Sequence, residues 1–299
     1  PNPQLGFFYG LAGFGVEHAF SRKRSEDNVS PSLSLQWDSS DEVTWYASAA
    51  RGFKAGGFNE SEVSGELANF EFDNEESTTF ELGAKTRLAN GAARLDFALF
   101  RTTFDDLQVS SFEGVSFIVG NAARAVSQGL EVEGDYLLND NWSLGGSFTV
   151  LDSTYDYFPD ANCTIAQTIA SGLGQACTQD LSGMDTQYAP SKSGSIYLAW
   201  EGATAAGHQL AARFSAYHSD GFYIDQDLDR SEYQSAYQKY GLRLSWTSVD
   251  GDWSVALIGK NLGDEITRNH GSDVPLLDGV HYATTDRPRS VALQLRKNF

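Results

Sequence analysis

The chain has 299 residues, of which 41% are hydrophobic and 13% aromatic, and its formal net charge is −19. No apolar run reaches the roughly 18 residues of a transmembrane helix, which excludes a helical membrane protein. The acidic charge argues against nucleic-acid binding, because phosphate contacts need clustered Lys and Arg. Abundant Gly, Phe and Tyr suit strands and turns better than helices.

Apolar and polar residues alternate with a period of two along much of the chain, which indicates strands with one apolar and one polar face. The clearest segments are residues 29–37, 80–88, 94–99, 130–138 and 291–299. A weaker segment lies at residues 8–20, where several Gly residues dilute the pattern. Counting back from the C-terminus predicts twelve strands, with both ends of the chain on the same side of the sheet.

The connections between these strands alternate between two kinds. Short turns rich in Asp, Asn and Gly lie at residues 38–41, 89–91, 139–141 and 249–252, with a slightly longer one at 202–207. Long polar stretches lie at residues 53–78, 156–188, 219–235 and 263–286, with a shorter link at 110–116. Short turns on one side and long loops on the other are typical of an outer-membrane barrel, so we predict an all-β, transmembrane antiparallel β-barrel.

The placement of tryptophan supports a membrane barrel. All six Trp residues lie within a few residues of a short turn, and none lies in a long stretch. Trp settles at the membrane–water interface and forms a girdle at a barrel rim. In a soluble β-sandwich, which is the main alternative, Trp would fill the core near the middle of the strands.

An ordered series of motifs resembles the barrel of TonB-dependent outer-membrane receptors over about residues 30–299. Residues 46–59 read YASAARGFKAGGFN, which resembles a family strand that rises into an extracellular loop. The further matching stretches are FELGAKT at 80–86, FDDLQV at 104–109, NAA at 121–123, GLEVE at 129–133, GKNLGDE at 259–265 and RPRS at 287–290. The terminal Phe299 resembles the signal that the outer-membrane assembly machinery reads.

The resemblance implies a fold and a set of partners. A plugged receptor barrel has about 22 strands, so twelve strands correspond to roughly its second half. No plug domain is recognised, and residues 1–299 are expected to be barrel throughout. The implied protein lies in the bacterial outer membrane, contacts lipid and lipopolysaccharide, and takes up a siderophore–iron complex, cobalamin, haem or a saccharide. The TonB complex would drive uptake through a plug, and other strands in the same or another chain would complete the barrel.

Two other functions stay open. The first alternative is a small self-closed barrel that acts as a passive pore or an adhesin. The second, which belongs to another class, is an outer-membrane hydrolase. No Gly-x-Ser-x-Gly elbow and no His-Glu-x-x-His motif occurs, so we expect no enzyme activity and no cofactor.

Two cysteines and two acidic runs are the other chemically distinct features of the long stretches. Cys163 and Cys177 are expected to form a disulfide, because two cysteines in an exported chain usually pair; two free thiols or metal ligation are the alternatives. Asp225, Asp227 and Asp229 would share one face of an extended segment and contact a divalent cation or a basic ligand. The interpretation favoured by the sequence is nevertheless a solvated acidic loop, and the same holds for the acidic residues of 60–76. His270 and His281 lie eleven residues apart in the last stretch and form a poor metal signature.

Ligand contacts are predicted from position alone. Aromatic residues near the outer ends of strands are expected to face the ligand, namely Phe53, Phe58, Tyr155, Tyr157, Phe222 and Tyr223. For Phe53 and Phe58, packing of the loop base is the alternative to lining the mouth of the lumen. Gly52, Gly56 and Gly57 are expected to let the strand bend, since Gly accepts a positive φ without penalty, and direct contact with the ligand is the alternative.

Overall fold

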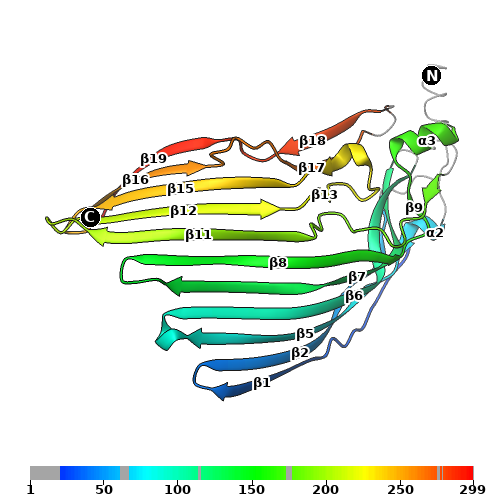
Figure 1. Ribbon diagram of the computed structural model, residues 1–299. Coiled ribbons are helices and arrows are strands. Elements are labelled where there is room, and N and C mark those ends of the chain that lie inside the picture. Colours follow the sequence, from blue (N-terminus) through cyan, green and yellow to red (C-terminus); the bar gives the residue numbers. More distant parts are fainter. Residues whose placement is uncertain are drawn as a thin grey trace.

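The computed structural model describes residues 21–60, 67–113, 116–172, 177–274, 277 and 279–298. Within them, eleven strands form one antiparallel sheet in which each strand pairs with the next in chain order (Figure 1). The sheet consists of β1 (Ser32–Ser40), β2 (Val43–Lys54), β5 (Glu75–Leu88), β6 (Ala93–Glu113), β7 (Ser116–Leu137), β8 (Trp142–Tyr157), β11 (Lys192–Ala203), β12 (Gln209–Ser219), β15 (Tyr237–Thr247), β16 (Trp253–Lys260) and β19 (Ser290–Lys297).

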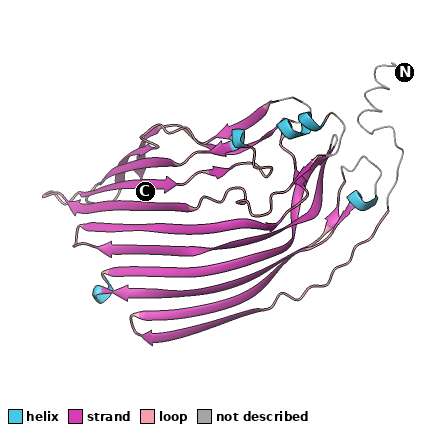
Figure 2. Ribbon diagram, turned by 45° about the vertical axis from the view of Figure 1, so that its right-hand side comes forward, coloured by secondary structure: helices cyan, strands magenta, loops and turns pink. Residues whose placement is uncertain are grey.

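The long connections all lie at one end of the sheet and contain short elements of their own (Figure 2). The four long polar stretches are thus loops that fold back, and each contains a short strand pair of its own. The additional elements are β3 (Gly57–Phe58), α2 (Leu67–Phe70), β4 (Glu71–Phe72), β9 (Ala161–Asn162), α3 (Ile165–Ser171), β10 (Thr178–Gln179), β13 (Phe222–Tyr223), η2 (Arg230–Glu232), β14 (Tyr233–Gln234), β17 (Arg268–Asp273) and β18 (His281–Thr285). At the opposite end, η1 (Ala89–Gly91) forms one of the short turns.

The strand count agrees with the prediction as far as the structure extends. The predicted strand at residues 8–20 lies outside the described residues, and the other eleven predicted strands are present. β1 and β19 are the two edges of the sheet, and they do not pair with each other in the described part of the chain. This portion of the chain is therefore an open, curved wall rather than a closed barrel.

One face of the wall is apolar, because the register aligns large aliphatic residues across neighbouring strands. Leu99 on β6 pairs with Leu82 on one side and Leu130 on the other. Leu293 on the edge strand β19 pairs with Leu257 and is 75% exposed. A face of exposed leucines is unfavourable in water and suited to lipid. This face spans the membrane.

The tryptophan side chains mark one rim of that apolar face. Trp37 pairs with Trp45 across the first short turn, and Trp142 pairs with Trp200. Lys297 lies over the ring of Trp253, with Nζ 5.0 Å from the ring centroid. These indole rings lie at the turn end of adjacent strands and at the same level along them. They form the girdle predicted for the membrane–water interface.

The opposite face of the wall is polar. Tyr46 donates a hydrogen bond to Glu81 across two strands (2.6 Å), and Tyr197 donates one to Asp135 (2.5 Å). The guanidinium of Arg213 stacks on the ring of Tyr197, 3.6 Å from its centroid. Polar side chains that satisfy one another in this way are typical of the lumen of a large barrel. No helix among the described residues is long and apolar enough to cross a bilayer.

Candidate functional site

The candidate site is the group of connections at the loop end of the wall, and the hairpin of β6 and β7 forms its support. These strands have 21 and 22 residues, about twice the 9–11 residues that cross a membrane. The hairpin therefore continues well beyond the apolar band. Asp106 adopts a positive φ of 55° at an irregularity in the pairing of the two strands. The side chain of Gln226, from the distant β12–β15 connection, donates a hydrogen bond to the backbone oxygen of Ser110.

A small apolar core lies beneath these connections. Tyr155, at the outer end of β8, is 3% exposed and packs on Phe158, with ring centroids 5.0 Å apart. The core also draws on β7 and on two different connections, and its buried members are Ala123, Ala125, Tyr155, Phe158, Ala161, Leu181 and Leu228. Because these residues come from separate parts of the chain, the β8–β11 and β12–β15 connections pack together with the outer ends of β7 and β8.

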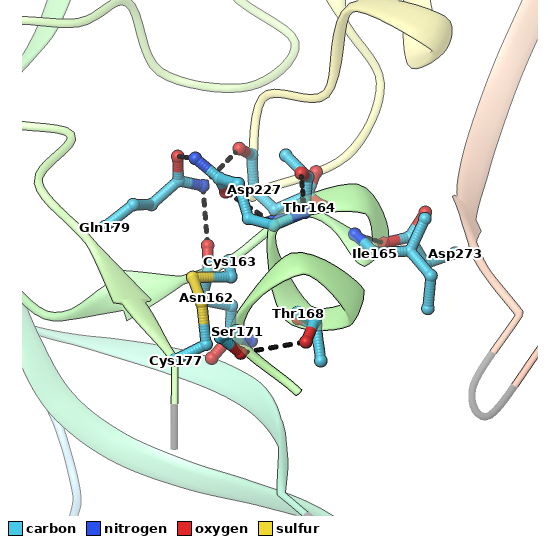
Figure 3. The surroundings of a disulfide bond; sticks show 11 residues. Asn162, Cys163, Thr164, Ile165, Thr168, Ser171, Cys177, Gln179, Asp227 and Asp273 are labelled. Carbon is cyan, nitrogen blue, oxygen red and sulfur yellow. Dashed lines mark hydrogen bonds between the residues drawn. A yellow bond between two sulfur atoms is a disulfide. The ribbon is translucent and has the colours of Figure 1, made fainter. Parts of the chain in front are cut away.

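The connection between β8 and β11 is held by a disulfide and by polar contacts to its neighbours (Figure 3). Cys163 and Cys177 are bonded, with their Cα atoms 5.7 Å apart, as predicted. The side-chain amide of Gln179 donates hydrogen bonds to the backbone oxygens of Asn162 (2.6 Å) and Asp227 (2.8 Å). The backbone N–H of Ile165 donates to Asp273 Oδ2 (2.7 Å). This connection therefore touches both later ones.

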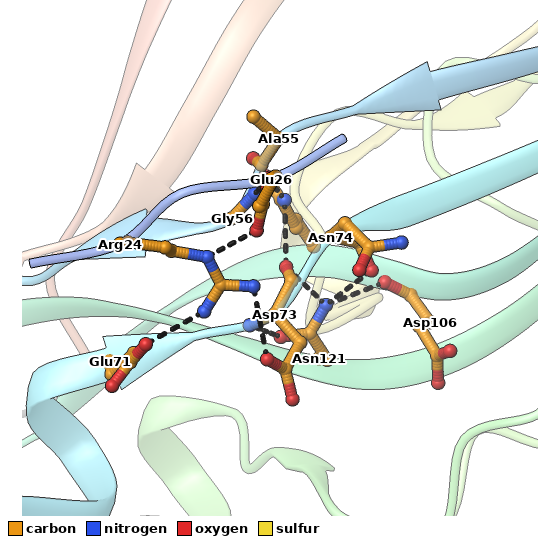
Figure 4. A network of polar contacts seen from close by, with 10 residues as sticks. Arg24, Glu26, Ala55, Gly56, Glu71, Asp73, Asn74, Asp106 and Asn121 are labelled. Carbon is orange, nitrogen blue, oxygen red and sulfur yellow. Dashed lines mark hydrogen bonds and ion pairs between the residues drawn. The ribbon is translucent and has the colours of Figure 1, made fainter. Parts of the chain in front are cut away.

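The connection between β2 and β5 is organised by Arg24 and Asn121 (Figure 4). The Arg24 guanidinium donates to Glu26, to Glu71 Oε1 (2.9 Å) and to Asp73 Oδ1 (3.1 Å). The side-chain amide of Asn121, on β7, donates to the backbone oxygen of Asp73 (2.9 Å) and accepts from its N–H (2.6 Å). The acidic residues of this connection that the structure describes thus serve partly as structural partners.

The three aspartates after β13 do not share one face, contrary to the prediction. Leu228 has a positive φ of 57°, so the segment is not extended. Oxygens of Asp225 and Asp227 lie within 4.8 Å of a Glu232 oxygen, whereas Asp229 faces Asp273 and His281. The sequence did not single out Glu232, because only the turn of η2 brings it back toward the aspartates.

Burial of these carboxyl groups perturbs their protonation. Burial raises the pKa of Asp227 to about 7, and the neighbouring Asp225 charge also raises it. Burial, followed by the charge of Asp225, raises the pKa of Glu232 well above its usual range. Burial also raises the pKa of Asp273, which lies on β17 beside them. Clusters of perturbed acids of this kind are often functional sites.

Of the aromatic residues predicted from the sequence to contact the ligand, some pack inside the loops and others are exposed. Tyr155 belongs to the loop core, and Phe58 stacks on Phe70 with ring centroids 5.3 Å apart. Phe53 pairs with Glu76 and lies an even number of residues from Trp45 on the same strand. Since alternate residues of a strand face the same side, Phe53 lies on the outer face with Trp45 rather than on the lumen face. Tyr157 is 59% exposed.

Phe222 and Tyr223 lie beside tyrosines that the sequence analysis did not select. Tyr223 packs against Tyr233, with ring centroids 5.0 Å apart, and Phe222 lies 6.1 Å from Tyr188. Both Phe222 and Tyr223 are half-buried. The hydroxyl of Tyr188 is 3.1 Å from His270 Nδ1.

A group of exposed hydrogen-bonding side chains extends from this point. His270 Nε2 lies 3.1 Å from the hydroxyl of Tyr282, so His270 bridges Tyr188 and Tyr282. Both tyrosines are more than 40% exposed. Tyr188 precedes His270 by 82 residues and Tyr282 follows it by 12, and no local sequence pattern links positions so far apart. The sequence analysis therefore did not identify this group.

A separate groove of about 470 Å³, lined by Leu33, Phe80 and Leu99 among others, opens on the lipid-facing surface and does not belong to this site.

The comparison with known proteins gives the family. Residues 8–262 match the family described as TonB dependent receptor-like, beta-barrel. The chain belongs to this family. Its place in the outer membrane and its all-β barrel fold are thereby confirmed, together with the resemblance read from the motifs.

Individual relatives of this TonB-dependent receptor barrel are receptors rather than enzymes. The pesticin receptor of Yersinia pestis is 29% identical over 133 residues, which cover 44% of the chain and 19% of that protein. The crystal structure of the ferric yersiniabactin uptake receptor of Yersinia pestis superposes with a TM-score of 0.70 at 20% identity, over 90% of the chain and 37% of that receptor. The siderophore receptor of Acinetobacter baumannii superposes with a TM-score of 0.67 at 19% identity, over 89% and 35%. The chain thus spans less than two-fifths of each relative.

Proposed function

We propose that this chain forms the second half of the barrel of an outer-membrane receptor that takes up a ferric chelate. The packing of two connections together at the loop end of a polar lumen wall carries the proposal, because a passive pore has no need of loops that bury a common core. The solved relatives include receptors for ferric yersiniabactin and for other siderophores, which favours an iron chelate over cobalamin, haem or a saccharide. We further propose that residues 1–299 are barrel throughout, and that energy comes from the TonB complex through a plug.

The proposed ligand-contacting groups are the exposed aromatic residues rather than the buried ones. Tyr188, His270 and Tyr282 present hydroxyl and imidazole groups from two connections, and Phe222 lies beside them. Planar rings with polar tips bind a chelate by apolar contact and hydrogen bonds together. Tyr157 is a further candidate because of its exposure. Tyr155, Phe53, Phe58 and Tyr223 are proposed to support the loops on which the contacting groups sit.

Uptake of a radiolabelled ferric siderophore by cells that depend on the intact receptor tests the function. We expect uptake in iron-limited cells, loss of uptake when TonB is deleted, and weaker ligand binding by the double variant Tyr188→Phe and Tyr282→Phe. Tyr240→Phe is the matched control, because this tyrosine lies on the lipid-facing side of β15 and is 36% exposed. Uptake that persists without TonB, or conductance through the purified protein in a planar bilayer, would support the passive pore instead.

A further inference from the structure

Two buried carboxylates and one half-buried carboxylate lie within the β12–β15 connection, at the junction of three connections. Asp225 and Asp227 follow β13, and Glu232 ends η2, so that one oxygen from each lies within 4.8 Å of the others. Asp227 is 6% exposed and Glu232 is 2% exposed. The backbone oxygen of Glu232 accepts a hydrogen bond from Ile224 N–H (3.0 Å), which holds the η2 turn against the end of β13.

The Glu232 carboxylate lacks the partner that its burial requires. Neither of its oxygens has a donor in hydrogen-bond geometry among the described residues, and the group close to it, the carboxyl of Asp225, can share a proton with it but cannot neutralise it as a base would. His281 Nδ1 is 3.7 Å from Glu232 Oε1 but is closer to Asp273 Oδ1, at 2.7 Å. No Lys or Arg in the described ranges forms an ion pair with the three carboxylates. Burying an unpaired carboxylate is costly, so the group is stabilised either by taking up a proton or by binding a cation, and only a cation would let all three acids stay charged.

The side chains of the two aspartates are each held by a hydrogen bond from the nearby backbone. Asp225 Oδ1 accepts a hydrogen bond from the N–H of Gln226 (2.8 Å), and Asp227 Oδ1 accepts one from the N–H of Asp229 (3.1 Å). Each side chain is therefore fixed by its own turn, which leaves its second oxygen available. Three preorganised carboxylates in a space less than 5 Å across form a hard, oxygen-only donor set.

We propose that Asp225, Asp227 and Glu232 bind a calcium ion. Calcium accepts six to eight oxygen ligands at about 2.3–2.6 Å in flexible geometry, and backbone oxygens and water complete such a shell. Magnesium demands a nearly ideal octahedron at about 2.0–2.1 Å and fits a loop site of this kind less well. Zinc prefers nitrogen and sulfur ligands, and the imidazole of His281, which lies beside Glu232, is engaged by Asp273.

The proposed ion joins several connections at the loop end of the wall. The backbone oxygen of Asp227 accepts the hydrogen bond from Gln179 next to the disulfide, and Asp273 beside the site accepts the hydrogen bond from Ile165. Gln226, between the two aspartates, reaches Ser110 on the β6–β7 hairpin. Neutralising the buried acids would therefore fix three connections at once. This inference concerns the loops only and does not depend on which ligand the receptor takes up.

The test uses the intact receptor in detergent, stripped with a chelator and then titrated with calcium by isothermal titration calorimetry. We expect Glu232→Gln to lower the affinity of one calcium by about tenfold or more, because the charge of the ligands sets affinity. Glu201→Gln, an exposed acid at the turn end of β11, is the matched control and should bind as the wild type does. Calcium should also slow proteolysis within residues 219–237 of the wild type only.

Other results would overturn the proposal. Equal calcium binding by the wild type and Glu232→Gln, or equal affinity for magnesium and calcium in the wild type, contradicts a calcium site at these carboxylates. If Glu232→Gln lacks the β-rich circular dichroism of the wild type, Asp225→Asn replaces it, because Asp225 is only half-buried. Unchanged binding by Asp225→Asn would then reject the site. Loss of calcium binding with unchanged siderophore uptake would separate this proposal from the proposed function.

Discussion

At the scale of single residues, the glycines of the GFKAGGFN segment (residues 52–59) were predicted to be required for a positive φ, and the structure gives a different reason for them. The expected positive φ is absent at Gly52, Gly56 and Gly57. Close approach is the actual constraint, because a Cβ on Gly56 would lie 2.3 Å from the backbone oxygen of Phe72 and 2.6 Å from Arg24 Cζ. Only the fold of the β2–β5 connection brings those atoms together.

The first prediction follows from this contact. Gly56→Ala should destabilise the β2–β5 connection by about 1–3 kcal/mol, because a backbone oxygen cannot move aside as a side chain can. Proteolysis of the intact receptor within that connection measures the effect. Gly120→Ala is the control, since a Cβ there would have no heavy atom within 4 Å. Equal cleavage rates for the two variants would show that the contact is not restrictive.

A second prediction concerns acid stability at the β18–β19 connection. Asp286 accepts hydrogen bonds from Lys239 (2.6 Å) and Thr267 (3.0 Å), and the Lys239 contact lowers the pKa of its carboxyl. A carboxyl whose pKa is lower in the folded state stabilises the fold above the ordinary Asp pKa of about 3.9. That contribution disappears as the pH falls through the folded-state value.

Thermal unfolding of the intact receptor between about pH 6 and pH 3 measures this contribution. We expect Asp286→Asn to unfold at a lower temperature than the wild type at pH 6, and the difference to shrink toward pH 3. Asp140→Asn, in an exposed short turn, should follow the wild type throughout. A constant difference between Asp286→Asn and the wild type would mean that the ion pair is not the cause.

At the scale of elements, each strand separates a lipid-facing row from a lumen-facing row. Leu99 is 51% exposed and lies between Leu82 and Leu130, whereas Ala98, one residue earlier, lies between Gly83 and Glu131. Adjacent residues of one strand thus meet opposite environments. This difference allows a matched test of the assignment of the two faces.

The third prediction compares arginine at these two positions. Leu99→Arg should destabilise the folded receptor by about 2–4 kcal/mol, because the charge enters the hydrocarbon region. Ala98→Arg should be tolerated, since Glu131 lies directly opposite in the lumen. Denaturant unfolding in lipid vesicles measures both variants. Equal destabilisation, or the reverse order, would show that the two faces are wrongly assigned.

At the scale of the whole molecule, the two edges of the sheet carry the main consequence. In the described residues, β1 and β19 lie at opposite edges, and a sheet edge exposed to lipid leaves backbone groups unsatisfied at several kcal/mol each. Eleven strands are half of the roughly 22 in a plugged receptor. The missing partners of β1 and β19 are therefore expected to be further barrel strands.

The fourth prediction is the mass of the native polypeptide. Mass spectrometry of the protein isolated from its own membrane should give more than twice the mass of these 299 residues, with a plug and the other strands in the same chain. A native mass equal to that of the 299 residues, together with a disulfide formed between cysteines introduced in the N-terminal segment and at Gln294, would support a small closed barrel.

The sequence by itself determined the fold class, the sidedness of the loops and the disulfide. Period-two alternation and Trp beside the short turns depend on neighbours along one strand or one hairpin, so local pattern suffices to read them. The pairing of Cys163 with Cys177 needed only two cysteines in one connection of an exported protein.

The tertiary structure alone decided which loop residues gather. Glu232 meets Asp225 only through the η2 turn, and His270 meets Tyr188 only when two connections pack together. The burial of Tyr155 likewise depends on Leu181 and Leu228, which come from distant parts of the chain. Loops have no repeating pattern that links their residues to partners far away in sequence. Their contacts follow from packing in three dimensions, which a single sequence does not encode in any local pattern.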